Sequence, residues 1–371
     1  MQGIYIHIPF CKSRCIYCDF YSTTKLDLRE KYVNSLCNEM VSRHNYLCNE
    51  DYNTIYIGGG TPSQLSLPQL SKIIFHLYST FRIAKNAEFT IEVNPDDISD
   101  ELLKYLKTSP VNRISMGVQT FSDQRLQFLH RRHSVAQVSK AVELCRQYGF
   151  HNISIDLIFG FPNQILDEWK SDVSQALAID VPHISAYSLM YEEGTRLTQM
   201  RDNGQISEIP DDTSCKMYDY LCTTLKDAGY IHYEISNFCK PNFHSRHNSS
   251  YWNNVPYLGL GAGAHSFDGN SRQWNSVMHN GEWEVEDIER LSPLQKYNEY
   301  IMTRLRTMQG VELDTLNSDF TYYFSQVKHL VDRHISNGNL KVNTDTRCLV
   351  LTLQGIHISN LVISDLMLTE E

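Results

Sequence analysis

Six short β-rich runs, separated by stretches long enough for helices, are the feature that most restricts the fold of this 371-residue chain. The runs are Ile4–Ile8, Thr54–Ile57, Glu88–Val93, Arg113–Val118, Asn152–Ile158 and His183–Leu189. Helical periodicity is present between them at Leu65–Tyr78, Asp123–Tyr148 and Asp167–Ile179. Strands joined by helices pair in parallel, and right-handed crossovers curl the sheet. The sequence therefore predicts an α/β fold with a partial (βα)6 TIM-like barrel; a doubly wound open sheet is the alternative.

Three cysteines follow the first run with the spacing C-x3-C-x2-C: Cys11, Cys15 and Cys18, in HIPFCKSRCIYCDFYS. Three thiolates this close cannot complete a four-ligand structural site alone. They can hold three irons of a [4Fe-4S] cluster and leave the fourth iron open to another ligand. Function in a parallel barrel lies at the carboxyl ends of the strands, where this loop is expected. From the spacing alone, a zinc site with a distant fourth ligand or three unrelated thiols remain alternatives.

Charge and cysteine usage restrict the class of protein further. The net charge of −10 and the pI near 5.8 argue against a general nucleic-acid binder. The sequence has no signal peptide before Ile4 and no apolar run long enough to span a bilayer, so we expect a cytoplasmic protein. Ten cysteines then indicate reduced thiols and metal ligation. The seven outside the triplet are interpreted as ordinary small residues: Cys37, Cys48, Cys145, Cys215, Cys222, Cys239 and Cys348.

A glycine turn and polar side chains follow the later strands at the same end as the cysteines. GGGTPS begins at Gly58 after the second run; its glycines let the backbone approach a ligand, and the lysine of a phosphate loop is absent. The third, fourth and fifth runs end near Glu92, Gln119 and Asp156. The glycines could form only a tight turn, and one or two of the polar residues could merely cap helices. Polar groups at three neighbouring strand ends predict one shared cavity.

The succession YIHIPFCxxxCxYC, GGGTPS, EVNP, GVQxF and IDLIFGxP resembles the oxygen-independent coproporphyrinogen oxidase branch of the radical S-adenosylmethionine (SAM) proteins. The resemblance implies a barrel of the radical SAM type, with a [4Fe-4S] cluster and SAM as cofactors. The family's cluster ligands fall on Cys11, Cys15 and Cys18. Its SAM contacts fall on Tyr5, Tyr17, Gly59, Gly60, Thr61, Glu92, Gln119, Arg131 and Asp156. A one-residue slip in LHRRHS would exchange Arg131 for Arg132.

Two departures separate the chain from the oxidase of that branch. Phe20 stands where the oxidase has a fourth cysteine, and the oxidase's long arm before the first strand is absent from this sequence. Both match the haem-chaperone subgroup, the HemW type, as does the HNxxYW motif at 247–252. The resemblance implies that His247 ligates haem iron near aromatic rings. His244 and His265 are other candidates, and a core histidine beside packing aromatics is the alternative.

The βα alternation stops at about Ser292, which divides the chain into a barrel domain of residues 1–291 and a C-terminal domain of residues 292–371. Helices are expected at Leu294–Met308, Phe320–Asn337 and near Gly355–Leu366, and a hairpin from Leu340–Val342 and Cys348–Leu353. Helices with a small hairpin resemble a winged-helix domain. Because lysine and arginine are scarce there, a lid or docking surface is favoured over DNA binding.

Two functional hypotheses follow. In the first, the protein is a haem chaperone that carries haem to acceptor haemoproteins, membrane respiratory enzymes among the candidates, with the cluster and SAM as accessories. In the second, an electron donor reduces the cluster and SAM is cleaved to a 5′-deoxyadenosyl radical. That radical would decarboxylate propionate side chains of coproporphyrinogen III oxidatively, giving protoporphyrinogen IX. Phe20 and the HNxxYW motif favour the chaperone. No nucleic-acid partner is expected, and a homodimer is a candidate assembly.

Overall fold

The main sheet of the protein is built around the six predicted strands. The computed structural model describes residues 1–47 and 50–369, so Cys48 lies outside the described residues. The sheet has 12 strands in the order β12-β11-β10-β9-β1-β2-β3-β4-β5-β6-β8-β7. Strands β1 to β6 pair in parallel. They are β1 (Gly3–Ile8), β2 (Tyr52–Gly59), β3 (Ile83–Val93), β4 (Arg113–Gln119), β5 (Ile153–Phe159) and β6 (His183–Ser188).

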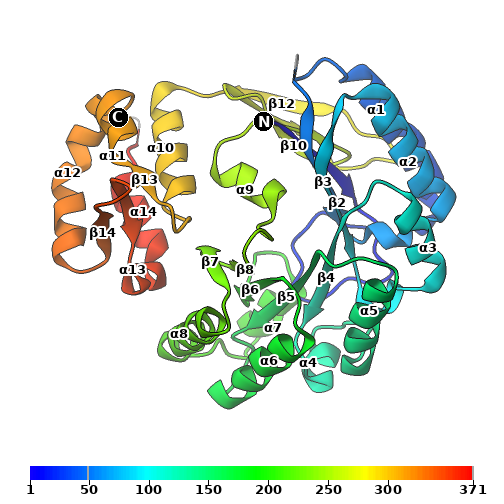
Figure 1. The fold of residues 1–371 in the computed structure, drawn as a ribbon, viewed down its shortest axis with the longest axis horizontal. Coiled ribbons are helices and arrows are strands. Elements are labelled where there is room, and N and C mark those ends of the chain that lie inside the picture. Colours follow the sequence, from blue (N-terminus) through cyan, green and yellow to red (C-terminus); the bar gives the residue numbers. More distant parts are fainter. Residues whose placement is uncertain (48–49, 370–371) are drawn as a thin grey trace.

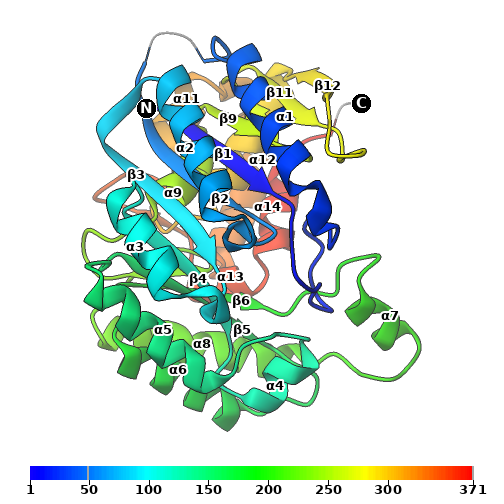
Figure 2. The same ribbon diagram turned by 90° about the vertical axis from the view of Figure 1, so that its right-hand side faces the viewer.

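The crossover helices cover one face of the curved sheet (Figures 1 and 2). They are α1 (Arg29–Ser42), α2 (Leu67–Thr80), α3 (Asp100–Thr108), α5 (Val135–Gln147) and α6 (Leu166–Ile179). Since β1 to β6 are adjacent in chain order, every right-handed crossover returns on the same side. A doubly wound sheet would reverse its strand order and carry helices on both faces. The partial barrel is therefore confirmed, and the doubly wound alternative is excluded.

The single helix predicted at Asp123–Tyr148 is wrong, because a loop interrupts it. Helix α4 (Asp123–Phe128) ends early, and His130 has a left-handed φ of 60°. Ser134 then starts α5 with a capping box. The apolar periodicity runs through this break, which explains the misprediction. The loop between the two helices carries Arg131 and Arg132.

The sheet is extended at both edges, so the barrel stays open. Beside β1 lie β9 (Tyr257–Leu260), β10 (His265–Phe267), β11 (Ser271–Asn275) and β12 (Val285–Arg290), of which β9 is parallel to β1. Beside β6 lie β8 (Asn237–Cys239) and β7 (Ile231–Glu234). The remaining helices before residue 292 are α7 (Arg196–Asp202), α8 (Asp211–Asp227), α9 (Arg246–Trp252), and the 3₁₀ turns η1 (Leu26–Leu28), η2 (Pro62–Gln64) and η3 (Pro95–Asp97).

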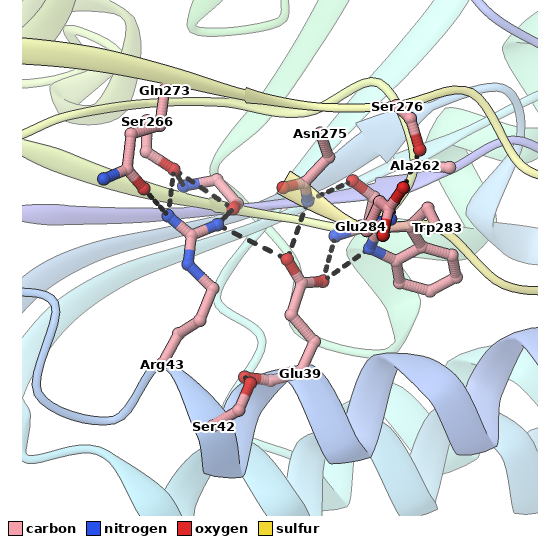
Figure 3. Close-up of polar contacts among 12 residues, drawn as sticks. Glu39, Ser42, Arg43, Ala262, Ser266, Gln273, Asn275, Ser276, Trp283 and Glu284 are labelled. Carbon is pink, nitrogen blue, oxygen red and sulfur yellow. Dashed lines mark hydrogen bonds and ion pairs between the residues drawn. The ribbon is translucent and has the colours of Figure 1, made fainter. Parts of the chain in front are cut away.

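A buried ion pair fastens α1 to the extension beside β1 (Figure 3). Glu39 accepts hydrogen bonds from the indole of Trp283 at 3.0 Å, the amide of Asn275 at 2.7 Å and the backbone nitrogen of Gly261 at 2.8 Å. Arg43 lies 3.4 Å from Glu39 and donates to the carbonyl of Gly259 at 2.9 Å. Both side chains are about nine-tenths buried. The contacts satisfy the two charges in place of water, as buried ions require.

The C-terminal part forms its own three-stranded sheet with helices around it, as Figure 1 shows in orange and red. Its elements are α10 (Pro293–Arg304), β13 (Val311–Glu312), α11 (Leu313–Ser318), α12 (Thr321–Ser336), β14 (Leu340–Asn343), β15 (Cys348–Leu351), α13 (Leu353–His357) and α14 (Ser359–Leu366). The predicted hairpin is present, with β14 antiparallel to β15. The helix predicted at Gly355–Leu366 is wrong as a single element, because the chain bends at Ile358 between α13 and α14.

This part packs directly on the open edge of the barrel. Residues of both parts belong to one continuous apolar core, among them Leu225 of α8 and Ile356 of α13. Backbone hydrogen bonds join Ile235 to Arg306 at 3.0 Å and Met308 to Tyr233 at 3.1 Å. Among the described residues, no helix is long and apolar enough to cross a membrane.

Candidate functional site

A cavity lies at the carboxyl ends of the parallel strands, and most of the predicted site residues line it. Those residues are Cys11, Cys15, Cys18, Tyr17, Gly59, Gly60, Thr61, Glu92, Gln119, Arg131 and Asp156. They come from the β1 loop, from the ends of β2 to β5 and, in the case of Arg131, from the loop between α4 and α5. The shared strand-end location therefore brings together side chains that lie far apart in the sequence.

Backbone hydrogen bonds hold the cysteine loop in place. The backbone nitrogen of Cys11 donates to the carbonyl of Thr23 at 2.9 Å, and the backbone nitrogen of Thr23 donates to the carbonyl of Pro9 at 2.7 Å. These two bonds close the loop at its base. Ile16, between two cysteines, is 3% exposed and bonds to Leu129 through its nitrogen at 3.3 Å. Because backbone hydrogen bonds hold the loop at its base and in its middle, the positions of the three cysteines are fixed relative to the barrel.

The three thiols of the cysteine loop are half-buried. Burial raises the pKa of the Cys18 thiol to about 11 and also raises the pKa of Cys11, so a bound cation would be needed to keep them as thiolates. Among the described residues, no three His, Cys, Asp or Glu side chains converge as ligands of one metal ion. Cluster ligands each bind a different iron and need not converge.

Arg131 reaches the cysteines, and its neighbour does not. The Arg131 guanidinium donates to Cys15 Sγ at 3.6 Å, to Asn94 Oδ1 at 2.6 Å and to the Gly117 carbonyl at 2.6 Å. Arg132 instead forms ion pairs at 3.1 Å with the carboxylates of Asp96 and Asp97. The geometry therefore assigns the contact with the cysteine loop to Arg131, although both arginines line the cavity.

The glycine turn after β2 lies against the start of the cysteine loop. Gly59 has a φ of +105°, and a Cβ there would lie 2.4 Å from the His7 ring. At Gly60 a Cβ would meet the Ile8 carbonyl at 2.8 Å. The Thr61 nitrogen donates to the Phe10 carbonyl at 2.8 Å. Only glycine fits this left-handed, close-packed turn, and the turn leaves backbone groups on the cavity wall.

Two buried carboxyls face the cavity with raised pKa values. Burial raises the pKa of Glu92 to about 7. Glu92 accepts hydrogen bonds from the Tyr56 hydroxyl at 2.6 Å and the Gly59 nitrogen at 3.0 Å, and these bonds lower its pKa and so oppose the shift. Burial likewise raises the pKa of Asp156 to about 6, and a hydrogen bond with Ser185 opposes that shift. A cationic ligand would restore both ionised forms. The cavity therefore favours a ligand that carries positive charge or hydroxyl groups.

Tyr5 and His247 lie together in a second chamber. Phe20, Gly59 and Glu92 line both this chamber and the cysteine cavity, so the two spaces are adjacent. The Tyr5 hydroxyl bonds with His7 Nδ1 at 3.0 Å. Tyr5 therefore lines the His247 chamber and not the cysteine cavity.

Both ring nitrogens of His247 are already hydrogen-bonded. Nδ1 lies 2.9 Å from the Thr54 hydroxyl and Nε2 lies 2.9 Å from the Tyr251 hydroxyl. The residue is 1% exposed, and burial lowers its pKa to about 3. An axial ligand of haem needs a free nitrogen lone pair, so His247 would first have to release one of these partners. The predicted role of His247 stays a prediction, and this geometry does not favour it.

The other histidine candidates have different surroundings. His244 is half-buried and packs on the ring of Tyr233 at 4.8 Å between centroids. His265 is exposed and lies 6.1 Å from the Trp274 ring. Neither of the two lines the cysteine cavity or the His247 chamber. Phe20 is 64% exposed and lines both of these spaces, at the position where a further cysteine would stand in the oxidase pattern.

Several residues of the cavity wall were not predicted from the sequence. They are Ser13, Arg14, Ser22, Val93, Asn94, Asp96, Ser115, Gly117 and His130. Asn94 could have been found, because it follows Glu92 in the EVNP run at the end of β3. His130 lies in a loop inside the region predicted as one helix, so no sequence signal placed it at the cavity.

Comparison with known proteins agrees with this site. Residues 5–176 match the Radical SAM superfamily. The chain is 35% identical to the heme chaperone HemW of Lactococcus lactis over 100% of this chain and 98% of that protein. It is 41% identical to the heme chaperone HemW of Bacillus subtilis over 74% of this chain and 73% of that protein. The fold is similar to that of coproporphyrinogen III oxidase (HemN) from Escherichia coli, with a TM-score of 0.84 and 19% identity, covering 98% of this chain and 89% of that one.

The open α/β barrel with a strand-end cysteine triplet thus defines a radical SAM protein. Within that superfamily, the chain belongs to the HemW family, because the identity to its members extends over the whole length.

Proposed function

We propose that the protein is a haem chaperone, which binds haem and passes it to acceptor haemoproteins. The observation that supports this most is the identity, over the full length of the chain, to relatives named heme chaperones. Phe20 replaces a cysteine of the oxidase pattern, which also favours a carrier over the oxidase. Haem is then cargo, and membrane respiratory enzymes are candidate acceptors.

The cysteine cavity is proposed to hold a [4Fe-4S] cluster and SAM. Cys11, Cys15 and Cys18 would ligate three irons and leave the fourth for SAM. Such a cluster supplies one-electron chemistry when an electron donor reduces it. Glu92 and Asp156 would orient the SAM amine and ribose hydroxyls, and Arg131 the methionine carboxylate. These assignments use the side chains that line the cavity.

A direct comparison of two activities tests the proposal. The reconstituted protein should bind ferric haem and deliver it to an apo-haemoprotein. It should convert coproporphyrinogen III no faster than the Cys15→Ala variant does. Protoporphyrinogen formed with SAM and a reductant would contradict the chaperone and support the oxidase. Absence of any haem binding by the wild-type protein would reject the chaperone as well.

A further inference from the structure

The cavity between the barrel edge and the C-terminal domain is about three times as large as the His247 chamber. Its walls come from β6, α8, the β7–β8 turn and α9 on one side, and from α13 and α14 on the other. Figure 1 shows α13 facing α8 and β7, with α9 between the barrel sheet and the C-terminal domain. We call this space the interdomain cleft.

The interdomain cleft presents flat and flexible apolar side chains at its mouth. Met190 is 61% exposed and Tyr187 is 39% exposed, and both line the cleft. Trp252 and Ile356 contribute further apolar wall. Exposed apolar groups that gather around a cavity are typical of binding sites for large apolar ligands. Aromatic rings and methionine suit a planar macrocycle in particular.

The cleft also contains an arginine that can pair with negatively charged groups of such a ligand and a histidine that can bind its metal. The guanidinium of Arg306 lies on the wall and is held by Asn360 Oδ1 at 3.1 Å. Arginine pairs readily with carboxylates, which haem carries as propionates. His357 lines the same wall, with Nε2 bonded to Asp219 at 2.9 Å. Nδ1 of His357 makes no hydrogen bond within the described part of the chain. Metal-bound histidines usually have such a carboxylate on the other nitrogen.

The HNxxYW motif connects the cleft to the cysteine cavity. Asn248 and Tyr251 line both the interdomain cleft and the His247 chamber. That chamber in turn shares Phe20 and Glu92 with the cysteine cavity. The three spaces therefore form one series from the cluster loop to the C-terminal domain. The motif residues between them face the cleft, while the motif's own histidine is bonded on both nitrogens.

We infer that haem is bound in the interdomain cleft, with its propionates toward Arg306 and its iron on the side of His357, and that His247 does not ligate it. This inference rests on the proposed function, since it supplies the site for the proposed cargo. In this arrangement His247 is a structural residue that positions α9. Helix α13 of the C-terminal domain takes part in binding the haem.

Titration with ferric haem separates this site from the motif histidine. Ser214→Trp places an indole in the cleft from α8, and Lys216→Trp on the same helix lies outside the cleft wall and is the matched control. We expect Ser214→Trp to weaken haem binding by about tenfold or more and Lys216→Trp to leave it unchanged. Unchanged SAM binding in both variants would show that Ser214→Trp is folded.

Two further variants test the orientation. Arg306→Ala should weaken the binding of haem but not of its dimethyl ester, because the ester lacks the propionate charges. His357→Ala should shift the absorption spectrum of bound haem, and His151→Ala, an exposed histidine before β5, should not.

Full haem affinity in both Ser214→Trp and Arg306→Ala would overturn the cleft site while leaving the chaperone proposal intact. If the absorption spectrum of bound haem shifts in His247→Gln but not in His357→Ala, the iron lies at the HNxxYW motif. That result would also overturn the cleft site. A wild-type protein that binds no haem at all would instead reject the proposed function.

Discussion

The ring nitrogen Nε2 of His247 lies 2.9 Å from the hydroxyl oxygen of Tyr251, one helical turn later on α9. Thr54 of β2 holds the other ring nitrogen at 2.9 Å. The histidine and tyrosine of the HNxxYW motif therefore satisfy each other inside the protein and fasten α9 to the barrel. The remaining polar and aromatic residues of the motif, Asn248 and Trp252, line the interdomain cleft.

Replacing the motif histidine should lower stability. His247→Leu leaves the buried hydroxyl of Thr54 without its partner, at a cost of about 1–3 kcal/mol, and also removes the partner of the Tyr251 hydroxyl. Urea denaturation should report a lower free energy of unfolding. The exposed His151→Leu is the control and should change it by less than about 0.5 kcal/mol. Equal stability of the two variants would contradict the structural role given to His247.

The cysteine triplet should be required for iron. Anaerobic reconstitution should give about four irons and four sulfides per chain. Alanine at Cys11, Cys15 or Cys18 should abolish the cluster, because each thiol would bind a separate iron. Cys37→Ala and Cys145→Ala change buried thiols away from the cavity and should retain it. Iron and sulfide analysis with the absorption spectrum is the measurement. Stoichiometric zinc without iron would contradict the radical SAM assignment of the site.

SAM should alter the electron paramagnetic resonance spectrum of the reduced cluster, since its amine and carboxylate can bind the open iron. Glu92→Gln and Asp156→Asn should weaken that response and leave the iron content unchanged, because both carboxyls line the cavity without contacting the cysteines. Glu101→Gln, an exposed residue of α3, is the control. Identical spectra with and without SAM in the wild-type protein would count decisively against SAM binding here.

The sequence predicted the barrel well because local patterns determine it. The order of β1 to β6 and their shared carboxyl edge follow from strand and crossover lengths, so Glu92 and Asp156 could be placed beside the cysteines without a structure. The loop at His130 could not be predicted, since one left-handed residue broke a continuous periodicity. The hydrogen bond between Thr54 and His247 joins residues 193 positions apart, and the interdomain cleft likewise depends on segments that lie far apart in the sequence. No local signal encodes such contacts.

Glu39 and Arg43 should stabilise the protein as a buried pair. The Arg43 guanidinium is about nine-tenths buried, and Glu39→Ala removes the carboxylate that pairs with it. Leaving a buried charge without its partner lowers the free energy of unfolding by about 3–5 kcal/mol. Glu30→Ala on the same helix removes an exposed contact 3.7 Å from Lys72 and should cost less than about 1 kcal/mol. Thermal unfolding of the two variants is the comparison. A Glu39→Ala protein as stable as Glu30→Ala would disprove the role assigned to the network in Figure 3.

The stability of the ligand-free protein should fall as the pH rises from about 4.5 to 7, partly because of Glu92. Burial raises the pKa of this carboxyl from 4.5 to about 7, so the folded chain holds a proton that the unfolded chain has already released in that window. Stability decreases with pH wherever the native state binds more protons. One pKa unit corresponds to about 1.4 kcal/mol, which gives Glu92 an effect on the order of 3 kcal/mol.

Urea denaturation at a series of pH values measures this effect. Glu92→Gln cannot ionise, so its unfolding free energy should fall less steeply between about pH 4.5 and 7 than that of the wild-type protein. Glu234 and Asp156 also have pKa values raised by burial, to about 7 and about 6, and should leave part of the slope in the variant. SAM affinity should change in the opposite direction and increase with pH, because the ionised Glu92 attracts the ligand's cationic groups. Parallel pH profiles for the wild-type protein and Glu92→Gln would refute the raised pKa of this carboxyl.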